Sequence, residues 1–109
     1  MTKLQGILAK NIKRARTRLN YSQMHLSELC GLSTSFLGEI EAGKKFPSPS
    51  NLEKIASVLG LKPYQLFFED EEWEVFDKYE HITSLYQELR EKINTDLEET
   101  IKNIFQNKR

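Results

Sequence analysis

The stretch SQMHLSELCGLSTSFLGEIEAGKK, residues 22–45, decides the fold of this 109-residue chain. Ser22 is a candidate N-cap, because its side chain can accept a hydrogen bond from the first turn of a helix. Apolar residues then recur at helical spacing, namely Leu26, Leu29 and Cys30. Gly31 follows them at the left-handed position that commonly ends a helix. The stretch therefore predicts a first helix that stops abruptly in a tight turn.

A second helix is predicted directly after the turn, with Ser33 as its N-cap. Placed on a helical wheel, one face of this helix carries Ser33, Phe36, Leu37 and Ile40. The other face is small and polar, and it is made of Thr34, Ser35, Gly38 and Glu39. A basic Gly43-Lys44-Lys45 segment follows. Two short helices joined by a tight turn form a helix-turn-helix motif.

The segment before the motif predicts one further helix. Thr2 and Gln5 have the spacing of a capping box. An apolar stripe follows at helical steps, consisting of Leu4, Leu8, Ile12, Ala15 and Leu19. The opposite side is basic and carries Lys10, Lys13, Arg14 and Arg18. These cations are available either to phosphate groups or to solvent alone.

The segment after the motif predicts two more helices. Ser48 followed by Pro49 is a good helix start, since proline at the first helical position loses no hydrogen bond. The buried stripe of that helix is Leu52, Ile55, Ala56 and Leu59, and Gly60 ends it. Pro63 then opens a short helix, Tyr64 to Phe68, whose Leu66 and Phe67 are expected to close the core.

The helix-turn-helix resembles the phage-repressor and Cro (XRE-type) DNA-binding domains. The matching residues are Gln23, Gly31, Leu37, the segment Ile40-Glu41-Ala42-Gly43-Lys44, Pro49, Leu52, Ile55-Ala56 and Leu59-Gly60. The resemblance covers roughly residues 4 to 68, and it implies an all-α, five-helix, lambda-repressor-like domain at residues 1–68. One departure is Ser27, because the family usually has Ala at this position.

The resemblance also implies roles for individual residues, with the recognition helix at residues 33–41 in the DNA major groove. The residues expected to contact base edges are Thr34, Ser35 and Glu39. The residues expected to contact phosphates are Gln23, Ser33, Lys44 and Lys45. Arg16 is expected to form an ion pair with Glu41. A carboxylate can accept from cytosine N4, although Glu39 facing solvent without a base role is the alternative.

Residues 69–109 predict a helical extension, since they contain no Gly or Pro. Thr83 and Ser84 are a candidate point at which this helix restarts. A long apolar stripe consists of Ile82, Leu85, Leu89, Ile93, Leu97, Ile101 and Ile104. Its mean spacing of about 3.7 residues exceeds the 3.5 of a heptad, which favours straight helix packing over a left-handed zipper. We expect a homodimer interface here, with folding back onto the domain as the alternative.

Charge is divided unevenly although the whole chain is neutral. Residues 1–68 contain 10 Lys or Arg and 4 Asp or Glu, whereas residues 69–109 contain 6 and 12. A basic domain with an acidic extension predicts a polyanionic partner for the first part only. Cys30 is the single cysteine, and both histidines are isolated. We therefore expect no disulfide, metal site, cofactor or catalytic residues, and a cytoplasmic protein without a membrane span.

The sequence thus predicts a DNA-binding transcriptional regulator that binds double-stranded DNA as a homodimer, of repressor or restriction-modification controller type. The alternative is an antitoxin-like interaction module. In that case the acidic, aromatic segment from Trp73 to Tyr86 would bind a partner protein. An enzyme is the weakest of the three classes, because no nucleophile with its base and no phosphate loop are present.

Overall fold

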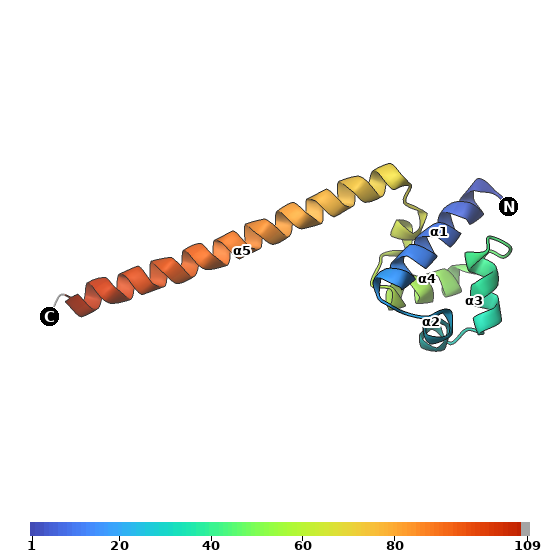
Figure 1. Ribbon diagram of the computed structural model, residues 1–109, viewed down its shortest axis with the longest axis horizontal. Helices are drawn as coiled ribbons and strands as arrows, with labels where there is room; N and C mark the ends of the chain where they lie inside the picture. Colours follow the sequence, from blue (N-terminus) through green and yellow to red (C-terminus); the bar gives the residue numbers. More distant parts are fainter. Residues whose placement is uncertain (108–109) are drawn as a thin grey trace. The chain divides into compact units, whose positions relative to one another are not determined.

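The computed structural model describes residues 1–107, and it contains only helices within that range (Figure 1). The helices are α1 (Lys3–Arg18), α2 (Gln23–Cys30), α3 (Thr34–Glu41), α4 (Pro49–Val58), the 3₁₀ helix η1 (Pro63–Phe67) and α5 (Asp70–Asn107). The predicted all-α fold is confirmed. Lys108 and Arg109, the last two residues of the predicted extension, lie outside the described residues.

Four helices begin at the hydroxyl caps that the sequence predicts. Ser22, Ser33 and Ser48 accept hydrogen bonds from the backbone N–H groups three residues ahead, over 3.0 to 3.2 Å. Thr2 and Gln5 form a complete capping box at the start of α1. Each cap satisfies an N–H group that has no partner inside its helix. Local sequence therefore determines where these helices start.

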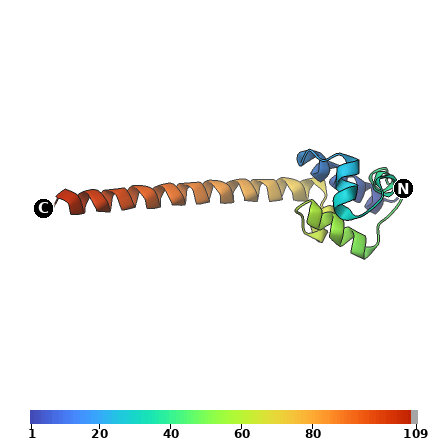
Figure 2. The ribbon, with the colours of Figure 1, turned by 90° about the horizontal axis from the view of Figure 1, so that it is seen from below.

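The hydrophobic core lies between α1 to α4 and η1, which gather around it in both views (Figures 1 and 2). The large apolar side chains that are exposed to 1% or less are Leu8, Ile12, Leu26, Leu37, Ile40, Ile55 and Leu66. Every one of these five elements contributes at least one of them. The core consequently holds α3 by its apolar side, and the opposite side of α3 remains at the surface.

Three leucines of the predicted apolar stripes are exposed. Leu29 is 49% exposed, whereas Leu26, Ser27 and Cys30 are the buried residues of the short α2. Leu4 and Leu19 are also exposed, and they lie at the two ends of the α1 region. A stripe along a helix is buried only where neighbouring elements cover it, and these three leucines lie on parts of the stripes that no element within residues 1–107 covers.

The short helix after Pro63 is a 3₁₀ helix over residues 63–67 rather than a helix from Tyr64 to Phe68. The backbone N–H of Lys62 donates to Gln65 Oε1 over 2.8 Å, which caps its start. Asn11 of α1 donates to the carbonyl oxygens of Leu66 and Phe68 over 2.7 and 2.8 Å. This buried amide fixes the segment against α1, and Leu66 closes the core as predicted.

The chain divides into two units, Met1–Asp70 and the remainder of α5 from Glu71. The helix α5 runs without a break, so the predicted restart at Thr83 and Ser84 is wrong (Figures 1 and 2). Serine and threonine are only weakly unfavourable inside a helix, and no Gly or Pro interrupts it. The seven residues of the predicted stripe, Ile82 to Ile104, are each 45 to 64% exposed.

Candidate nucleic-acid interface

The turn between α2 and α3 fixes the direction of the second helix of the motif. Gly31 ends α2 in the left-handed conformation, with φ of 68°. The backbone N–H of Leu32 then donates back to the Ser27 carbonyl over 2.9 Å. The next residue, Ser33, is the N-cap of α3. The reversal thus takes three residues, and it needs the conformational freedom of glycine.

The structure brings the three predicted base-contact residues onto the side of α3 that faces away from the core. Thr34 and Ser35 are exposed, and Glu39 is partly exposed. Leu37 and Ile40 of the same helix are buried. The outer side is therefore short and polar at its N-terminal end, and it carries a carboxylate one turn further on.

Glu39 is not a bare carboxylate, because Lys45 forms an ion pair with it. Lys45 Nζ lies 2.9 Å from Glu39 Oε2 and 5.9 Å from the centre of the Phe36 ring. The backbone N–H groups of Lys44 and Lys45 also donate to the Glu39 carbonyl oxygen. The loop after α3 is thereby folded back onto the end of the helix.

The four predicted phosphate contacts lie in different surroundings. The Lys44 ammonium is exposed and has no side-chain partner within residues 1–107. Ser33 Oγ accepts from Phe36, and its own hydrogen is not used by that bond. Gln23 Nε2 donates to Glu41 over 3.3 Å, which uses one of its two hydrogens. Only Lys45 is held by an ion pair, through Glu39.

The structure brings Arg16 and Glu41 together as a two-pronged ion pair. Arg16 Nε donates to Glu41 Oε2 over 2.8 Å, and Arg16 Nη2 donates to Glu41 Oε1 over 3.0 Å. Arg16 Nη1 donates to the carbonyl oxygen of Tyr21 over 2.8 Å. Both side chains are nearly buried, with 12% and 4% of their surfaces exposed. This arrangement ties α1 to the last residue of α3.

The basic side of α1 is partly neutralised by acidic residues within the same unit. Lys10 Nζ donates to both carboxylate oxygens of Asp70, over 2.9 and 3.0 Å. Lys3 lies 3.5 Å from Glu69. The hydrogen bond from Lys10 and the charge of its ammonium lower the pKa of Asp70. Lys10 is therefore less available to phosphate than its sequence position alone indicates.

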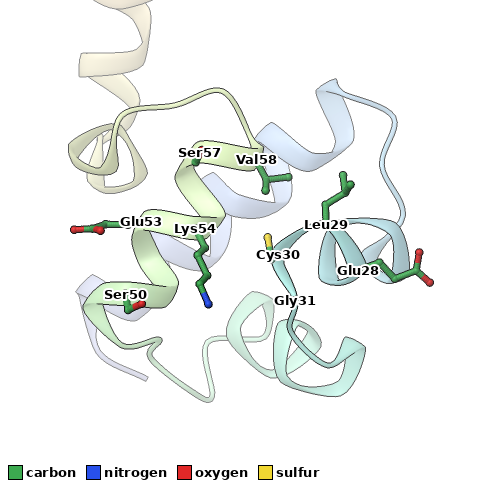
Figure 3. Close-up of a pocket in the computed structure, with 9 residues that line it drawn as sticks. All are labelled: Glu28, Leu29, Cys30, Gly31, Ser50, Glu53, Lys54, Ser57 and Val58. Carbon is green, nitrogen blue, oxygen red and sulfur yellow. The ribbon is translucent and has the colours of Figure 1, made fainter.

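A shallow groove lies between the end of α2 and α4, and Figure 3 shows the side chains around it. The Cys30 thiol and the Lys54 side chain lie toward its middle, and Leu29 and Val58 line one side (Figure 3). Burial raises the pKa of Cys30, and Lys54 opposes this shift more weakly. The thiol is therefore held in its protonated, unreactive form, which suits a structural cysteine.

The family model for the helix-turn-helix family HTH_3 matches residues 12–66, half of the chain. The chain belongs to this family. It is accordingly a DNA-binding, XRE-type helix-turn-helix protein, and the predicted resemblance is confirmed. The matched residues begin within α1 and end in η1.

The HTH_3 chain is similar in sequence to three proteins that are named as a transcription factor, a controller protein and a regulator. A hypothetical transcription factor of Neisseria meningitidis is 33% identical over 69 residues, which cover 63% of this chain and 65% of that protein. The restriction-modification controller protein C.AhdI of Aeromonas hydrophila is 32% identical, with a TM-score of 0.56 over 58% of this chain and 96% of its own. The biofilm regulator SinR, solved in complex with DNA, is 32% identical, with a TM-score of 0.54 over 56% of this chain and 98% of its own.

The sequence did not reveal two contacts at the surface of the HTH_3 motif. Ser27 Oγ lies 3.0 Å from Thr34 Oγ1, and Lys45 pairs with Glu39. The departure of Ser27 from the usual Ala was the one available signal for the first contact. The ion pair between Lys45 and Glu39 joins residues close in sequence. Helical spacing does not predict it, because Lys45 lies in the loop after α3 and the rule for side-chain pairs holds only within a helix.

Within residues 1–107 no helix combines the length and the apolar character that crossing a bilayer requires. Over the same residues, no three His, Cys, Asp or Glu side chains are grouped to hold a metal ion.

Proposed function

We propose that this chain regulates transcription by binding a two-half-site operator as a homodimer, with α3 in the major groove of double-stranded DNA. The regulator would be of the repressor or restriction-modification controller type. One observation carries the proposal: α3 is held by its apolar side, while its outer side offers Thr34, Ser35 and Glu39 next to Lys44. An α-helix of this kind fits the major groove, where each base pair has a distinct pattern of donors and acceptors.

Charge supports the same role. Residues 1–68 carry six more basic than acidic residues, and the exposed Lys44 follows directly after the recognition helix. Lysine side chains at this position neutralise phosphates and release counterions, which supplies much of the affinity for DNA. The relatives add further support, since SinR is named in complex with DNA and C.AhdI is named as a controller protein.

The homodimer is supported by the apolar stripe of α5, Ile82 to Ile104, which is half exposed in a single chain. Leaving such a surface in water costs about 25 cal/mol for each Å² of apolar area. Pairing of two copies about a two-fold axis would cover it. It would also bring two recognition helices to one operator, whose half-sites lie about 34 Å apart.

Selection from a random pool of duplex DNA tests the DNA-binding part of the proposal. The parent chain is expected to enrich one sequence that contains two related half-sites. Glu39→Gln is expected to change the enriched sequence, whereas the matched control Glu53→Gln, on the exposed surface of α4, is expected to leave it unchanged. No enrichment by the parent chain, or identical sequences from all three proteins, would contradict the assigned role of α3.

Sedimentation of the full chain tests the dimer separately. Leu89→Glu places a charge in the stripe and is expected to yield a monomer at micromolar concentration. Gln87→Glu adds the same charge on the opposite side of α5 and is expected to leave a dimer. A parent chain that sediments as a monomer would remove the dimer from the proposal.

An antitoxin-like role is the second candidate, because Tyr79 and Tyr86 of α5 are 69% and 64% exposed. Exposed aromatic side chains of this kind are typical of surfaces that bind another protein. Isolation of the full chain from its source organism distinguishes the two functions. A second protein that co-purifies in a fixed ratio, and that is lost with Tyr79→Ala, would favour the antitoxin-like role.

A further inference from the structure

The hydroxyl groups of Ser27 and Thr34 form a short chain of hydrogen bonds at the surface between α2 and α3. Ser27 Oγ lies 2.7 Å from the carbonyl oxygen of Met24 and 3.0 Å from Thr34 Oγ1. Ser27 is 1% exposed, so the protein interior determines its partners. Thr34 is the first residue of α3, and it is exposed.

The direction of this chain follows from the number of hydrogens. A serine hydroxyl has one hydrogen to donate, and a carbonyl oxygen can only accept. The hydrogen of Ser27 must therefore go to Met24, and the bond between the two hydroxyls must use the hydrogen of Thr34. Thr34 Oγ1 consequently has no hydrogen left for an outside partner. Toward an outside partner, its two lone pairs can only accept.

Glu39 has the same character on the next turn of α3. Its carboxylate pairs with Lys45 Nζ at 2.9 Å, and an ionised carboxylate accepts hydrogen bonds without donating any. Lys45 is itself held near the Phe36 ring, which limits the directions open to the pair. Two of the three predicted base-contact residues can thus only accept hydrogen bonds from DNA. Thr34 is restricted by its bond to Ser27, and Glu39 is restricted by its charge.

We propose that the outer side of α3 selects bases that carry an exocyclic amino group in the major groove, and that Ser27 sets this selectivity. Adenine N6 and cytosine N4 are the donors on that edge, whereas guanine O6 and thymine O4 only accept. Each base pair has one such amino group, on one of its two strands. Hydrogen-bond acceptors at fixed positions on α3 therefore select base pairs whose amino group lies on the contacted strand. Ser27 is a positioning residue, because it acts through Thr34 without touching DNA. This inference rests on the proposed function.

The role of Ser27 can be separated from that of Thr34 by substitution. Ser27→Ala removes the inner partner, so the Thr34 hydroxyl is free to turn and to donate as well as accept. Guanine or thymine would then be tolerated where the parent chain requires adenine or cytosine. Thr34→Val keeps the shape of the side chain and removes the acceptor. Because Ala is the usual family residue at position 27, Ser27→Ala is expected to fold.

The test is selection of the full chain and its variants on a random duplex pool, followed by titration with fluorescently labelled duplexes. At one position of each half-site, the parent chain is expected to bind duplexes with adenine or cytosine about fivefold or more tightly than duplexes with guanine or thymine. This ratio is what a single mismatched base pair commonly costs in affinity. Ser27→Ala is expected to lose most of that ratio while binding the best duplex about as tightly. Thr34→Val is expected to lose both the ratio and part of the affinity. The control Ser57→Ala, on exposed α4, is expected to behave like the parent.

A modified duplex provides the second readout. Replacing the selected adenine or cytosine by an analogue that lacks the amino group is expected to weaken the parent chain about fivefold and to leave Thr34→Val unaffected. An unchanged amino preference in Ser27→Ala, or DNA binding by the parent chain without any such preference, would overturn this assignment alone. Failure of the parent chain to bind any duplex would overturn the proposed function and this assignment together.

Discussion

Glu41, the last residue of α3, is held by the guanidinium group of Arg16 from α1 through two hydrogen bonds of 2.8 and 3.0 Å. The same guanidinium group donates to the carbonyl oxygen of Tyr21 in the first connection. One side chain thus links α1, the entry to α2 and the end of α3. Since a buried pair of this kind gains little net stability over apolar residues, its value lies in positioning α3.

Removing one partner of this pair is expected to be costly. Glu41→Ala would leave the Arg16 charge nearly buried without its acceptor, and the free energy of unfolding should fall by about 3 kcal/mol. The double substitution Arg16→Met with Glu41→Leu should recover much of that loss, because neither buried charge remains. Urea unfolding at fixed pH measures both, with the exposed Glu28→Ala as the control. A loss below about 0.5 kcal/mol for Glu41→Ala would mean that the pair is solvated.

Helix starts and the turn were predictable from sequence because they depend on neighbouring residues. Ser22, Ser33 and Ser48 cap helices through backbone groups three positions away, so nothing distant is needed. The exposure of Leu29 could not be predicted in this way, because it depends on α4, whose position relative to α2 is a tertiary property. Periodicity marks a face of a helix, but it does not report which part of that face is covered.

The candidate site likewise has features that the sequence predicted and features that only the structure shows. The resemblance supplied the positions on α3, and the helical wheel indicated which of them lie away from the core. The hydrogen bond between Ser27 and Thr34 joins two helices, and its direction depends on the carbonyl group of Met24. A pattern of residue types contains neither of these facts. The chemical character of the surface, accepting or donating, therefore required the structure.

Substitution of Gly31 tests the turn. Apart from Gly31 and its two chain neighbours, no residue within 1–107 has a heavy atom within 4 Å of the position that a Cβ would occupy, so the cost of a side chain comes from the left-handed backbone. Gly31→Val is expected to lower the free energy of unfolding by about 1 to 3 kcal/mol. Gly31→Asn, which tolerates this conformation, should lose much less. Thermal unfolding followed by circular dichroism measures the difference, and equal melting temperatures for the two variants would contradict the geometry.

The ion pair between Lys10 and Asp70 predicts a dependence of stability on pH. Because the pKa of Asp70 is lowered in the folded chain, its contribution is complete above the ordinary value of about 3.9 and is lost as the pH falls through the lowered value. Asp70→Asn should therefore reduce stability at pH 7, and this difference should shrink as the pH falls below about 3.9. Urea unfolding at low salt measures this difference, which salt should reduce since both side chains are exposed. If the stability difference between the parent and Asp70→Asn were the same at all pH values, it would not come from the ion pair between Lys10 and Asp70.

Lys44 and Lys45 are expected to differ in their effects on DNA binding, although both are exposed lysines of one loop. Lys44 has no side-chain partner within residues 1–107. Lys44→Ala should remove one phosphate contact and lower the slope of log affinity against log salt by about one unit, for every DNA sequence alike.

Lys45→Ala should weaken binding more than Lys44→Ala, because it also leaves the Glu39 carboxylate without its ammonium partner. An unpaired carboxylate on the recognition helix repels phosphate, so this additional loss should disappear in the double variant Lys45→Ala with Glu39→Gln. Titration of labelled duplex from about 50 to about 200 mM salt measures the DNA affinity of all three variants. Lys62→Ala, at the start of η1, is the matched control for loss of one exposed lysine. If Lys45→Ala behaved like Lys44→Ala, and Glu39→Gln brought no recovery, Lys45 would be a simple phosphate contact with no part in holding Glu39.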